Sequence, residues 1–287
     1  MRYDAAQLET LRLIADEGSF EAAARKLHLT PSAVSQRVRA LEVSAGQVLV
    51  RRTSPAEVTA AGEPLLRLAR QVHVLAAEAE SLLSDDGVVE LTVAINADSL
   101  ATWFRPVLGQ VARRPGTVLR LQVEDEAHSH ALLRRGEVLA AITSEPTPVQ
   151  GCSVEHLGNL RYLPAAAPEL LERHRKGRGV DWSAMPMVVF NEKDQLQDVV
   201  LATHGAQRPA VVHRVPTSAD FLAAISGGLG WGMVPVPQFV SDDLVRLPGA
   251  KPLSVPLYWQ RWRLESPGLE LLTRDVKAAG RNMHAAQ

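Results

Sequence analysis

Residues 18–42 read GSFEAAARKLHLTPSAVSQRVRALE and carry the strongest structural signal in this chain. Two short helical patterns flank a tight break within the stretch. Thr30 can cap the second helix through its side-chain oxygen, and Pro31 suits the first helical position, where no backbone donor is needed. A single buried stripe along this helix is predicted by the spacing of Val34, Val38 and Leu41. The stretch therefore predicts a helix-turn-helix.

The exposed face of the second helix carries polar side chains of the kinds that read DNA. Small hydroxyls, an amide and an arginine on a short helix fit the major groove, where residues near the helix start reach the base edges. This face presents Ser32, Ser35, Gln36 and Arg39. The pattern indicates a DNA-binding domain at the amino terminus.

A small hairpin, or wing, is predicted after this helix. Residues 47–59 alternate toward a strand, turn and return. Between residues 25 and 52 the chain has six cations and one anion, although its overall formal charge is only −1. Phosphate binding depends on local charge, so we expect Arg51 and Arg52 to lie along the DNA backbone. An ordinary solvated charged surface is the alternative interpretation.

Length and composition predict a protein of two or three domains. A chain of 287 residues exceeds the usual size of one domain, and its 46% hydrophobic content suffices for packed cores. Cys152 is the only cysteine, which excludes an intrachain disulfide framework or a thiolate zinc site. The sequence shows no leader pattern and no apolar run of about 18 residues. We therefore expect a cytoplasmic protein without a membrane partner.

A long helix is predicted over residues 61–87, after a first domain of residues 1–60. Its apolar residues alternate at spacings of three and four, which is the seam of a coiled coil of about three heptads. We favour dimerisation through this seam because no nearby segment offers a partner, and a dimer would place two reading helices on a two-fold DNA site. Packing of the helix on its own domain is the alternative. The seam consists of Leu65, Leu68, Val72, Leu75, Ala79 and Leu82.

The hydrophobic pattern of the sequence changes after Gly87, where strand patterns begin to alternate with helical ones. This alternation predicts an α/β domain with a mostly parallel sheet, and its loose duplication predicts two lobes. The first lobe would comprise residues of about 88–162 and 258–287, and the second about 163–257. Strands are expected at 89–95, 118–123, 139–142, 187–190, 211–215, 231–234 and 257–259, and helices at 100–112, 130–135, near 196, at 219–226 and at 268–279.

Several stretches of the chain resemble the LysR-type transcriptional regulators. The amino-terminal ones are AAARKLHLTPSAVSQRVRALE at 22–42, GQVLVRR at 46–52 and TAAG at 59–62. Further stretches resemble the LysG/ArgP branch of that family, whose members regulate lysine and arginine export. They are INADSLATWF (95–104), LQVEDEAH (121–128), LLRRGEVLAAIT (132–143) and YWQRWRLES (258–266).

The resemblance implies a winged helix-turn-helix, a dimerising linker helix and a two-lobed effector domain like that of periplasmic binding proteins. It implies that the bases are faced by Pro31, Ser32, Ser35 and Gln36, and that Thr30, Arg37, Arg52 and Thr53 lie near phosphates. The implied partners are double-stranded promoter DNA, RNA polymerase, further copies of the chain in a dimer or dimer of dimers, and lysine, arginine or histidine as effector. The implied function is activation of a basic amino-acid exporter gene, with no cofactor.

A basic amino acid needs partners for its carboxylate, its ammonium group and its cationic tail. In an open α/β sheet, ligands lie outside the carboxyl ends of the strands. There, backbone donors at a helix start can hold a carboxylate, and acidic side chains suit a cation. In the first lobe these strand ends bring Asn96, Ala97, Asp98, Ser99 and Thr102, then Glu124, Asp125 and Glu126, then Thr143 and Ser144. Trp103 or Phe190 is expected to cover the alkyl stem of the ligand. The second lobe is expected to supply a further helix start at Ser218, Ala219 and Asp220.

Each group of candidate effector residues has a structural alternative. Asp98 can simply cap the helix that follows it. On a strand, Glu124 and Glu126 point to one side and Asp125 to the other, so at least one of them is expected to be a surface charge. Trp103 is a candidate for the hydrophobic core, and residues 218–220 can form an ordinary cap.

No sequence pattern supports catalysis. A Gly-x-Ser-x-Gly elbow, a phosphate-binding loop and a His-Glu-x-x-His motif are absent from the sequence. The glycine-rich residues 227–232 follow a helical pattern and precede a strand, which is the reverse of a dinucleotide fingerprint. His128 and His130 alone are too few for a metal site. We expect neither an enzyme nor a metal protein; the alternative to a ligand-responsive regulator is an architectural DNA-binding protein that needs no effector.

Overall fold

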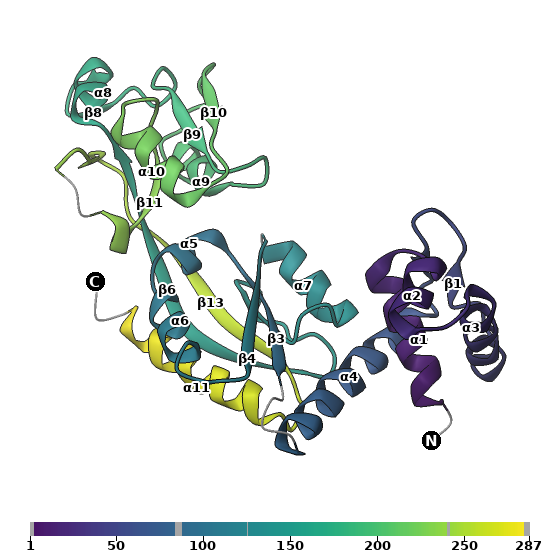
Figure 1. Ribbon diagram of the computed structural model, residues 1–287. Coiled ribbons are helices and arrows are strands. Elements are labelled where there is room, and N and C mark those ends of the chain that lie inside the picture. The colour runs from purple at the N-terminus through teal and green to yellow at the C-terminus, as the bar shows by residue number, and fades with distance from the viewer. Residues whose placement is uncertain (1–2, 84–87, 125, 240–241, 284–287) are drawn as a thin grey trace.

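The computed structural model describes residues 3–83, 88–124, 126–239 and 242–283. Figure 1 shows three parts in chain order, namely a small helical domain, the long helix α4 (Glu63–Leu83) and a larger α/β domain. The α/β domain has two lobes, and the second lobe lies at the end of the molecule away from the helical domain.

The amino-terminal domain is a helix-turn-helix followed by a short hairpin, as the sequence predicts. The side chains of Asp4, Ser19 and Thr30 cap its three helices by accepting hydrogen bonds from backbone N–H groups of the first turns. The buried stripe of α3 packs with Leu8 and Leu11 of α1 in one core. The elements are α1 (Ala5–Glu17), α2 (Phe20–Leu27), α3 (Pro31–Ala45), β1 (Val50–Arg51) and β2 (Glu57–Val58).

Two local features hold the turn and the wing. His28 adopts a left-handed backbone conformation (φ 53°), which ends α2 and lets the chain enter α3 directly. The Glu42 carboxylate of α3 accepts hydrogen bonds from the backbone N–H groups of Leu49 (2.9 Å) and Val50 (3.3 Å). The wing is therefore tied to the last turns of the helix that precedes it.

Helix α4 packs on both domains. Leu65, Leu66 and Ala69 are buried in the core of the amino-terminal domain, where α1 runs along α4. Farther on, Val74 packs against the core of the α/β domain. The expectation that α4 has no nearby partner segment is therefore wrong, because α1 and the α/β domain both cover part of it.

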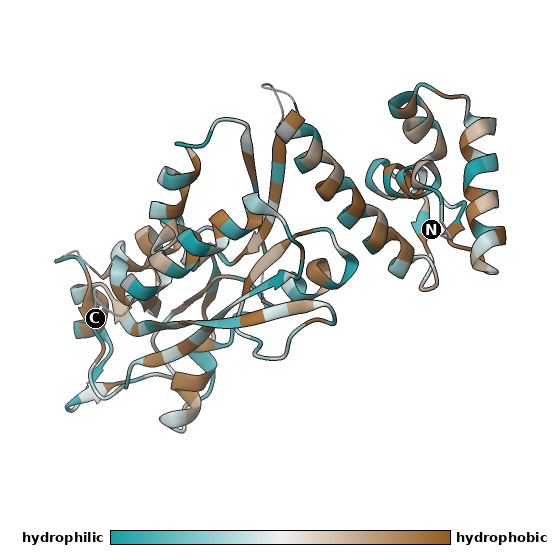
Figure 2. Cartoon of the chain, turned by 90° about the horizontal axis from the view of Figure 1, so that it is seen from below, coloured by the Kyte–Doolittle hydropathy of each residue, from teal (hydrophilic) through white to brown (hydrophobic). Residues whose placement is uncertain are grey.

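The predicted seam of α4 lies partly outside these contacts. Leu75 is 39% exposed and Ala79 is exposed, whereas Leu68 and Val72 are half-buried. The side chain of Leu82 and residues 84–87, where the helix was expected to end, lie outside the described residues. Figure 2 shows hydrophobic residues recurring along α4 from end to end. The helix thus keeps an apolar strip that its own chain does not cover.

The first lobe is built on three parallel strands, with β3 between β4 and β5. Alternate residues of β3 face opposite sides: Leu91, Val93 and Ile95 share a core with α6 and α11, and Ala94 packs with residues of α7. The elements are β3 (Val89–Ile95), α5 (Ala97–Ala101), α6 (Arg105–Val111), β4 (Thr117–Val123), α7 (Glu126–Arg135), β5 (Ala140–Thr143) and α11 (Pro267–Asn282).

The helix expected over residues 100–112 is two helices. Helix α5 ends at Ala101, and α6 begins at Arg105 with Pro106 in its first turn. Proline has no backbone N–H and clashes with the preceding turn, so one continuous helix through this point is disfavoured. The helix that follows β3 is therefore the short α5, and α6 is a separate helix.

The sheet is mixed rather than mostly parallel, which corrects the prediction. The long strands β6 (Cys152–Ala166) and β13 (Leu253–Trp262) are antiparallel to each other and run between the lobes, and β13 is antiparallel to β5. The short strands β11 (Gly232–Pro235) and β12 (Val245–Arg246) are antiparallel to β6. The register between β6 and β13 shifts between Leu257 and Tyr258, near the predicted lobe boundary.

The second lobe has a smaller parallel pair, β9 (Met187–Val189) and β10 (Val212–Arg214). Its interior includes Trp231, which meets Trp182 edge to face with ring centres 4.9 Å apart. The remaining elements are α8 (Pro168–Arg173), β7 (Arg175–Lys176), β8 (Gly179–Val180), α9 (Leu196–Thr203), α10 (Ser218–Ser226) and the 3₁₀ turn η1 (Val236–Gln238).

Candidate DNA-binding and effector sites

The polar face of α3 is open to solvent at the end of the molecule away from the α/β domain (Figure 1). The Thr30 hydroxyl accepts a hydrogen bond from the Ala33 backbone N–H (3.2 Å) and lies 2.9 Å from the Ser32 hydroxyl. The cap therefore also orients Ser32 at the helix start. The exposed residues are Thr30, Pro31, Ser32, Gln36 and Arg39, with Ser35 and Arg37 half-buried.

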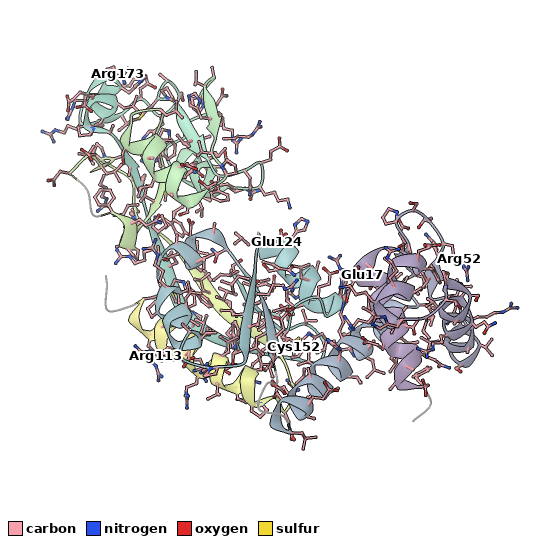
Figure 3. All side chains as sticks on the ribbon, viewed as in Figure 1. Glu17, Arg52, Arg113, Glu124, Cys152 and Arg173 are labelled. Carbon is pink, nitrogen blue, oxygen red and sulfur yellow. The ribbon has the colours of Figure 1, made fainter. Side chains whose placement is uncertain are left out.

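The wing brings its cations to the same domain. Arg51, Arg52 and Thr53 are all exposed. The Arg52 guanidinium lies 4.6 Å from the centre of the Phe20 ring, which holds it beside the start of α2 (Figure 3). The Thr53 hydroxyl donates to the Pro55 carbonyl oxygen (2.7 Å), so it is already used within the turn. This surface has the charge and the small polar groups that a duplex needs.

The structure joins Asp98 of the first lobe to the second lobe. One oxygen of its carboxylate accepts a hydrogen bond from the Tyr162 hydroxyl of β6 (2.9 Å), and the other lies 3.5 Å from the Ser218 hydroxyl of α10. Gln238 donates to the Ser218 hydroxyl in turn (3.1 Å). Asp98 stands inside α5, whose cap residue is Asn96, so its side chain faces the lobe boundary instead of capping the helix.

Three buried polar atoms lie near Asp98 in the sequence and have no hydrogen-bond partner among the described residues. They are Asn96 Oδ1, Ser99 Oγ and Trp103 Nε1. Buried polar groups are nearly always paired in native proteins, so each of these atoms is a candidate contact for a polar ligand or an ordered water. Trp103 also packs edge to face with Phe104 in the main core, which supports its structural alternative.

Other predicted effector residues have contacts within their own lobe. The Thr102 hydroxyl donates to the Asp98 carbonyl oxygen, and the Thr143 hydroxyl accepts from the Glu145 backbone N–H. Ser144 is half-buried beside Thr143.

In the second lobe, Phe190 packs against Phe221 with ring centres 6.3 Å apart. Asp220 is exposed and bonds to Thr217, the cap residue of α10, as in the predicted ordinary cap. Ala219 is also exposed.

The acidic run follows β4. Glu124 is half-buried at the end of β4 nearest the second lobe (Figure 3), and its backbone N–H donates to the Ile95 carbonyl oxygen of β3. Asp125 and the side chain of Glu126 lie outside the described residues. His128 accepts a hydrogen bond from Lys193 of the second lobe (2.7 Å). The part of the chain that the structure describes holds no cluster of three metal-binding side chains.

Sequence reasoning missed Tyr162, Gln238 and Lys193. Each meets its partner far along the chain, and only Lys193 does so from the other lobe. No local spacing reveals such contacts. Tyr162 is 3% exposed in the interior of β6, a strand that the sequence analysis did not predict. A buried tyrosine normally finds a partner for its hydroxyl, which is the one signal that sequence could have offered.

A separate groove of about 930 Å³ lies between α1, α4 and the first lobe, and none of the predicted effector residues lines it. Its charges already have partners, since Arg12 pairs with Glu9 and Asp16, and Arg120 with Glu90. Burial lowers the pKa of Arg12, but the hydrogen bonds and charges of Glu9 and Asp16 outweigh burial and raise it. The groove therefore offers fewer unpaired groups to a ligand than the region around Asp98.

Two family models match this chain. Residues 5–63 match the bacterial regulatory helix-turn-helix protein, lysR family, and residues 85–280 match the LysR substrate binding domain. The chain is a LysR-type transcriptional regulator. This places it among transcription regulators and not among enzymes, as the sequence predicts.

This LysR-type regulator is similar to the lysine export transcriptional regulatory protein LysG of Corynebacterium glutamicum, with 48% identity over 94% of this chain and 95% of LysG. The structure of full-length LysG from that organism with bound effector arginine matches with a TM-score of 0.84 and 45% identity, over 97% of this chain and 98% of that one. ArgP from Mycobacterium tuberculosis matches with a TM-score of 0.87 and 41% identity, over 96% of each chain. None of the described helices of the regulator is both long and apolar enough to cross a membrane.

Proposed function

We propose that this regulator binds a basic amino acid between its two lobes and activates a gene for a basic amino-acid exporter. The observation that carries the proposal is the Asp98 carboxylate, which sits in a polar network shared by both lobes. A carboxylate at that position can pair with the ammonium or guanidinium group of lysine or arginine. The likeness to LysG with bound arginine supports the same ligand class.

The neighbouring groups suit the rest of an amino acid. Ser99 Oγ can donate to the ligand carboxylate, and Asn96 Oδ1 can accept from an ammonium group; both atoms are buried and unpaired among the described residues. Glu124 offers a second carboxylate from the end of β4. Two anions placed apart suit a ligand with two cationic groups. The proposal covers lysine, arginine and histidine.

We further propose that two copies of the chain join through α4, as a dimer or a dimer of dimers. The exposed Leu75 and the apolar strip around it support this, because a coiled-coil seam needs such a strip. The proposed division is 1–60 for DNA binding, 61–87 for the linker and 88–287 for the effector domain, with lobes of about 88–162 plus 258–287 and about 163–257. RNA polymerase is the proposed partner at the promoter, in the cytoplasm.

Calorimetry tests the ligand. Lysine, arginine and histidine are titrated into the full-length protein, with norleucine as the control that keeps the alkyl stem but lacks the cationic tail. We expect heat for at least one basic amino acid and none for norleucine. Protection of DNA upstream of the regulator's own gene is then compared with and without that ligand. Unchanged protection and unchanged melting temperature with all three basic amino acids would exclude the proposal and favour an architectural protein, whose binding is steeply salt-dependent and independent of sequence.

A further inference from the structure

The carboxyl end of α7 is closed partly by its own chain. An α-helix leaves its last four carbonyl oxygens without partners inside the helix. In α7, the Gly136 N–H donates to the Leu133 oxygen (3.0 Å) and the Glu137 N–H donates to the Leu132 oxygen (2.9 Å). This is the pattern of a Schellman motif, which satisfies two of the four carbonyls.

Two arginines of α4 satisfy the other two. Arg67 Nη1 lies 3.4 Å from the Arg134 carbonyl oxygen, and Arg70 Nη1 lies 2.9 Å from the Arg135 carbonyl oxygen. Cations at the carboxyl end of a helix also interact favourably with the helix dipole. The linker helix thus completes the capping of a helix in the effector domain.

The two helices are in direct contact at this point. Gly136 has φ of 71°, and a Cβ atom added there would lie 3.4 Å from both Cα and Cγ of Arg67. A glycine therefore serves both the left-handed conformation and the close approach of α4. Figure 1 shows α7 on the side of the sheet that faces α4. Movement of the end of α7 would press directly on the linker.

Arg70 continues the contact into the DNA-binding domain. Its second terminal nitrogen, Nη2, lies 2.7 Å from the Asp16 carboxylate of α1, and the arginine side chain is only 15% exposed. One planar guanidinium therefore holds a carbonyl of the effector domain and a carboxylate of the DNA-binding domain at once. Lysine cannot replace it, because an ammonium group lacks this fork of donors.

The other end of α7 meets the lobe boundary. Its first residue comes two positions after Glu124 at the end of β4, and its first turn includes His128, which bonds to Lys193 of the second lobe (2.7 Å). At 1.5 Å per residue, this helix of 10 residues spans about 15 Å. One helix therefore touches the second lobe at its start and the linker helix at its end.

We propose that α7 and Arg70 couple effector binding to the placement of the DNA-binding domain. This inference rests on the proposed function, in which a basic amino acid changes the arrangement of the lobes. A shift of the second lobe moves Lys193 against His128 and favours one position of α7. The Arg135 carbonyl then moves against Arg70, whose remaining bond holds Asp16. Such coupling is reciprocal, so DNA must also change the affinity for the amino acid.

Coupling is measured on the full-length protein with arginine as the ligand. DNA affinity is measured by fluorescence anisotropy with and without arginine, and arginine affinity by calorimetry with and without DNA. The variants are Arg70→Met, Arg70→Lys and Lys193→Met. Arg120→Met is the matched control, because it removes a cation that lines the same groove but pairs only within the first lobe.

We expect arginine to change the DNA affinity of the native protein by about 5- to 150-fold, the usual range of allosteric coupling. In both Arg70 variants this factor should fall below about twofold, while arginine affinity without DNA stays within about twofold of the native value. Lys193→Met should lower the factor from the opposite end of α7, and Arg120→Met should leave it unchanged.

The failures are distinguishable. If arginine does not change the DNA affinity of the native protein, both the inference and the proposed function are overturned. Coupling that is intact in native protein and in the Arg70 variants would overturn the inference alone. If Arg70→Met lowers the melting temperature enough to prevent measurement, Lys193→Met decides, since this exposed side chain is not part of a core. Full coupling in Lys193→Met would then reject the role of α7.

Discussion

The Tyr162 hydroxyl donates a hydrogen bond to the Asp98 carboxylate, with 2.9 Å between the two oxygens. Asp98 belongs to the short helix α5 of the first lobe, and Tyr162 to the strand β6 that runs between the lobes. The bond orients the carboxylate from which the effector proposal starts. Removal of the bond should therefore weaken the site less than removal of the charge.

Asp98→Asn should lower arginine affinity by about 10- to 100-fold, because it removes a charge-assisted pair of about 1.5–3 kcal/mol. Tyr162→Phe should cost about 0.5–1.5 kcal/mol, since it removes one orienting bond. Calorimetry on both single variants and on the double variant measures the coupling between the two residues. Unchanged affinity in Asp98→Asn would show that Asp98 is a structural residue only.

Gln36→Ala should weaken binding to the specific promoter site by about 1–3 kcal/mol and leave binding to random DNA almost unchanged, as expected when a base contact is lost. Arg52→Ala is the companion variant. It should weaken both DNAs alike and lower the salt dependence, because it removes a phosphate contact. Anisotropy titrations over a salt series check both variants. Equal loss on both DNAs for Gln36→Ala would assign this residue to the backbone instead.

Leu75→Glu should shift the protein toward monomers, because it places a charge in the exposed apolar seam of α4. Leu83→Glu is the matched control, since Leu83 is 89% exposed and lies outside the seam pattern. Sedimentation velocity over a concentration series measures the dissociation. The same association state in native protein and in Leu75→Glu would argue against a dimer built on this seam.

Cys152 should resist alkylation in the folded protein. It is 2% exposed, and burial raises the pKa of its thiol from 9.0 to about 12, although Arg67 and Arg263 act in the opposite direction. The thiol is therefore neutral at pH 8, and the thiolate is the reactive form. Mass spectrometry after iodoacetamide treatment should find labelling in urea and little in native protein. Equally fast labelling in both would show that the site opens readily.

The same pKa shift gives a sign for the dependence of stability on pH. Well below pH 9 the thiol is protonated in both the folded and the unfolded chain, so it contributes no pH dependence there. As pH rises from 9 toward about 12, only the unfolded chain releases the proton, and stability is lost. Cys152→Ser should remove this part of the alkaline loss in urea titrations.

The amino-terminal domain could be predicted almost completely because its signals are local. Ser19 and Thr30 cap helices through atoms within three residues, and the stripe of α3 follows from helical spacing. Strand β3 also has the predicted bounds, residues 89–95, since its alternation is uninterrupted. Each of these patterns needs only its own neighbours in the chain.

Distant contacts produced most of what the pattern of residues did not predict. Strand β6 contains polar residues such as Glu155 and Asn159 that hide its apolar pattern, and it is held by pairing with β13, about 100 residues away. The hydrogen bonds of Asp98 with Tyr162 and of Arg70 with Asp16 join elements that only the tertiary structure brings together. Hydrogen bonds between segments that are far apart leave no periodicity in a sequence, so the site near Asp98 and the coupling through α7 emerge from packing alone.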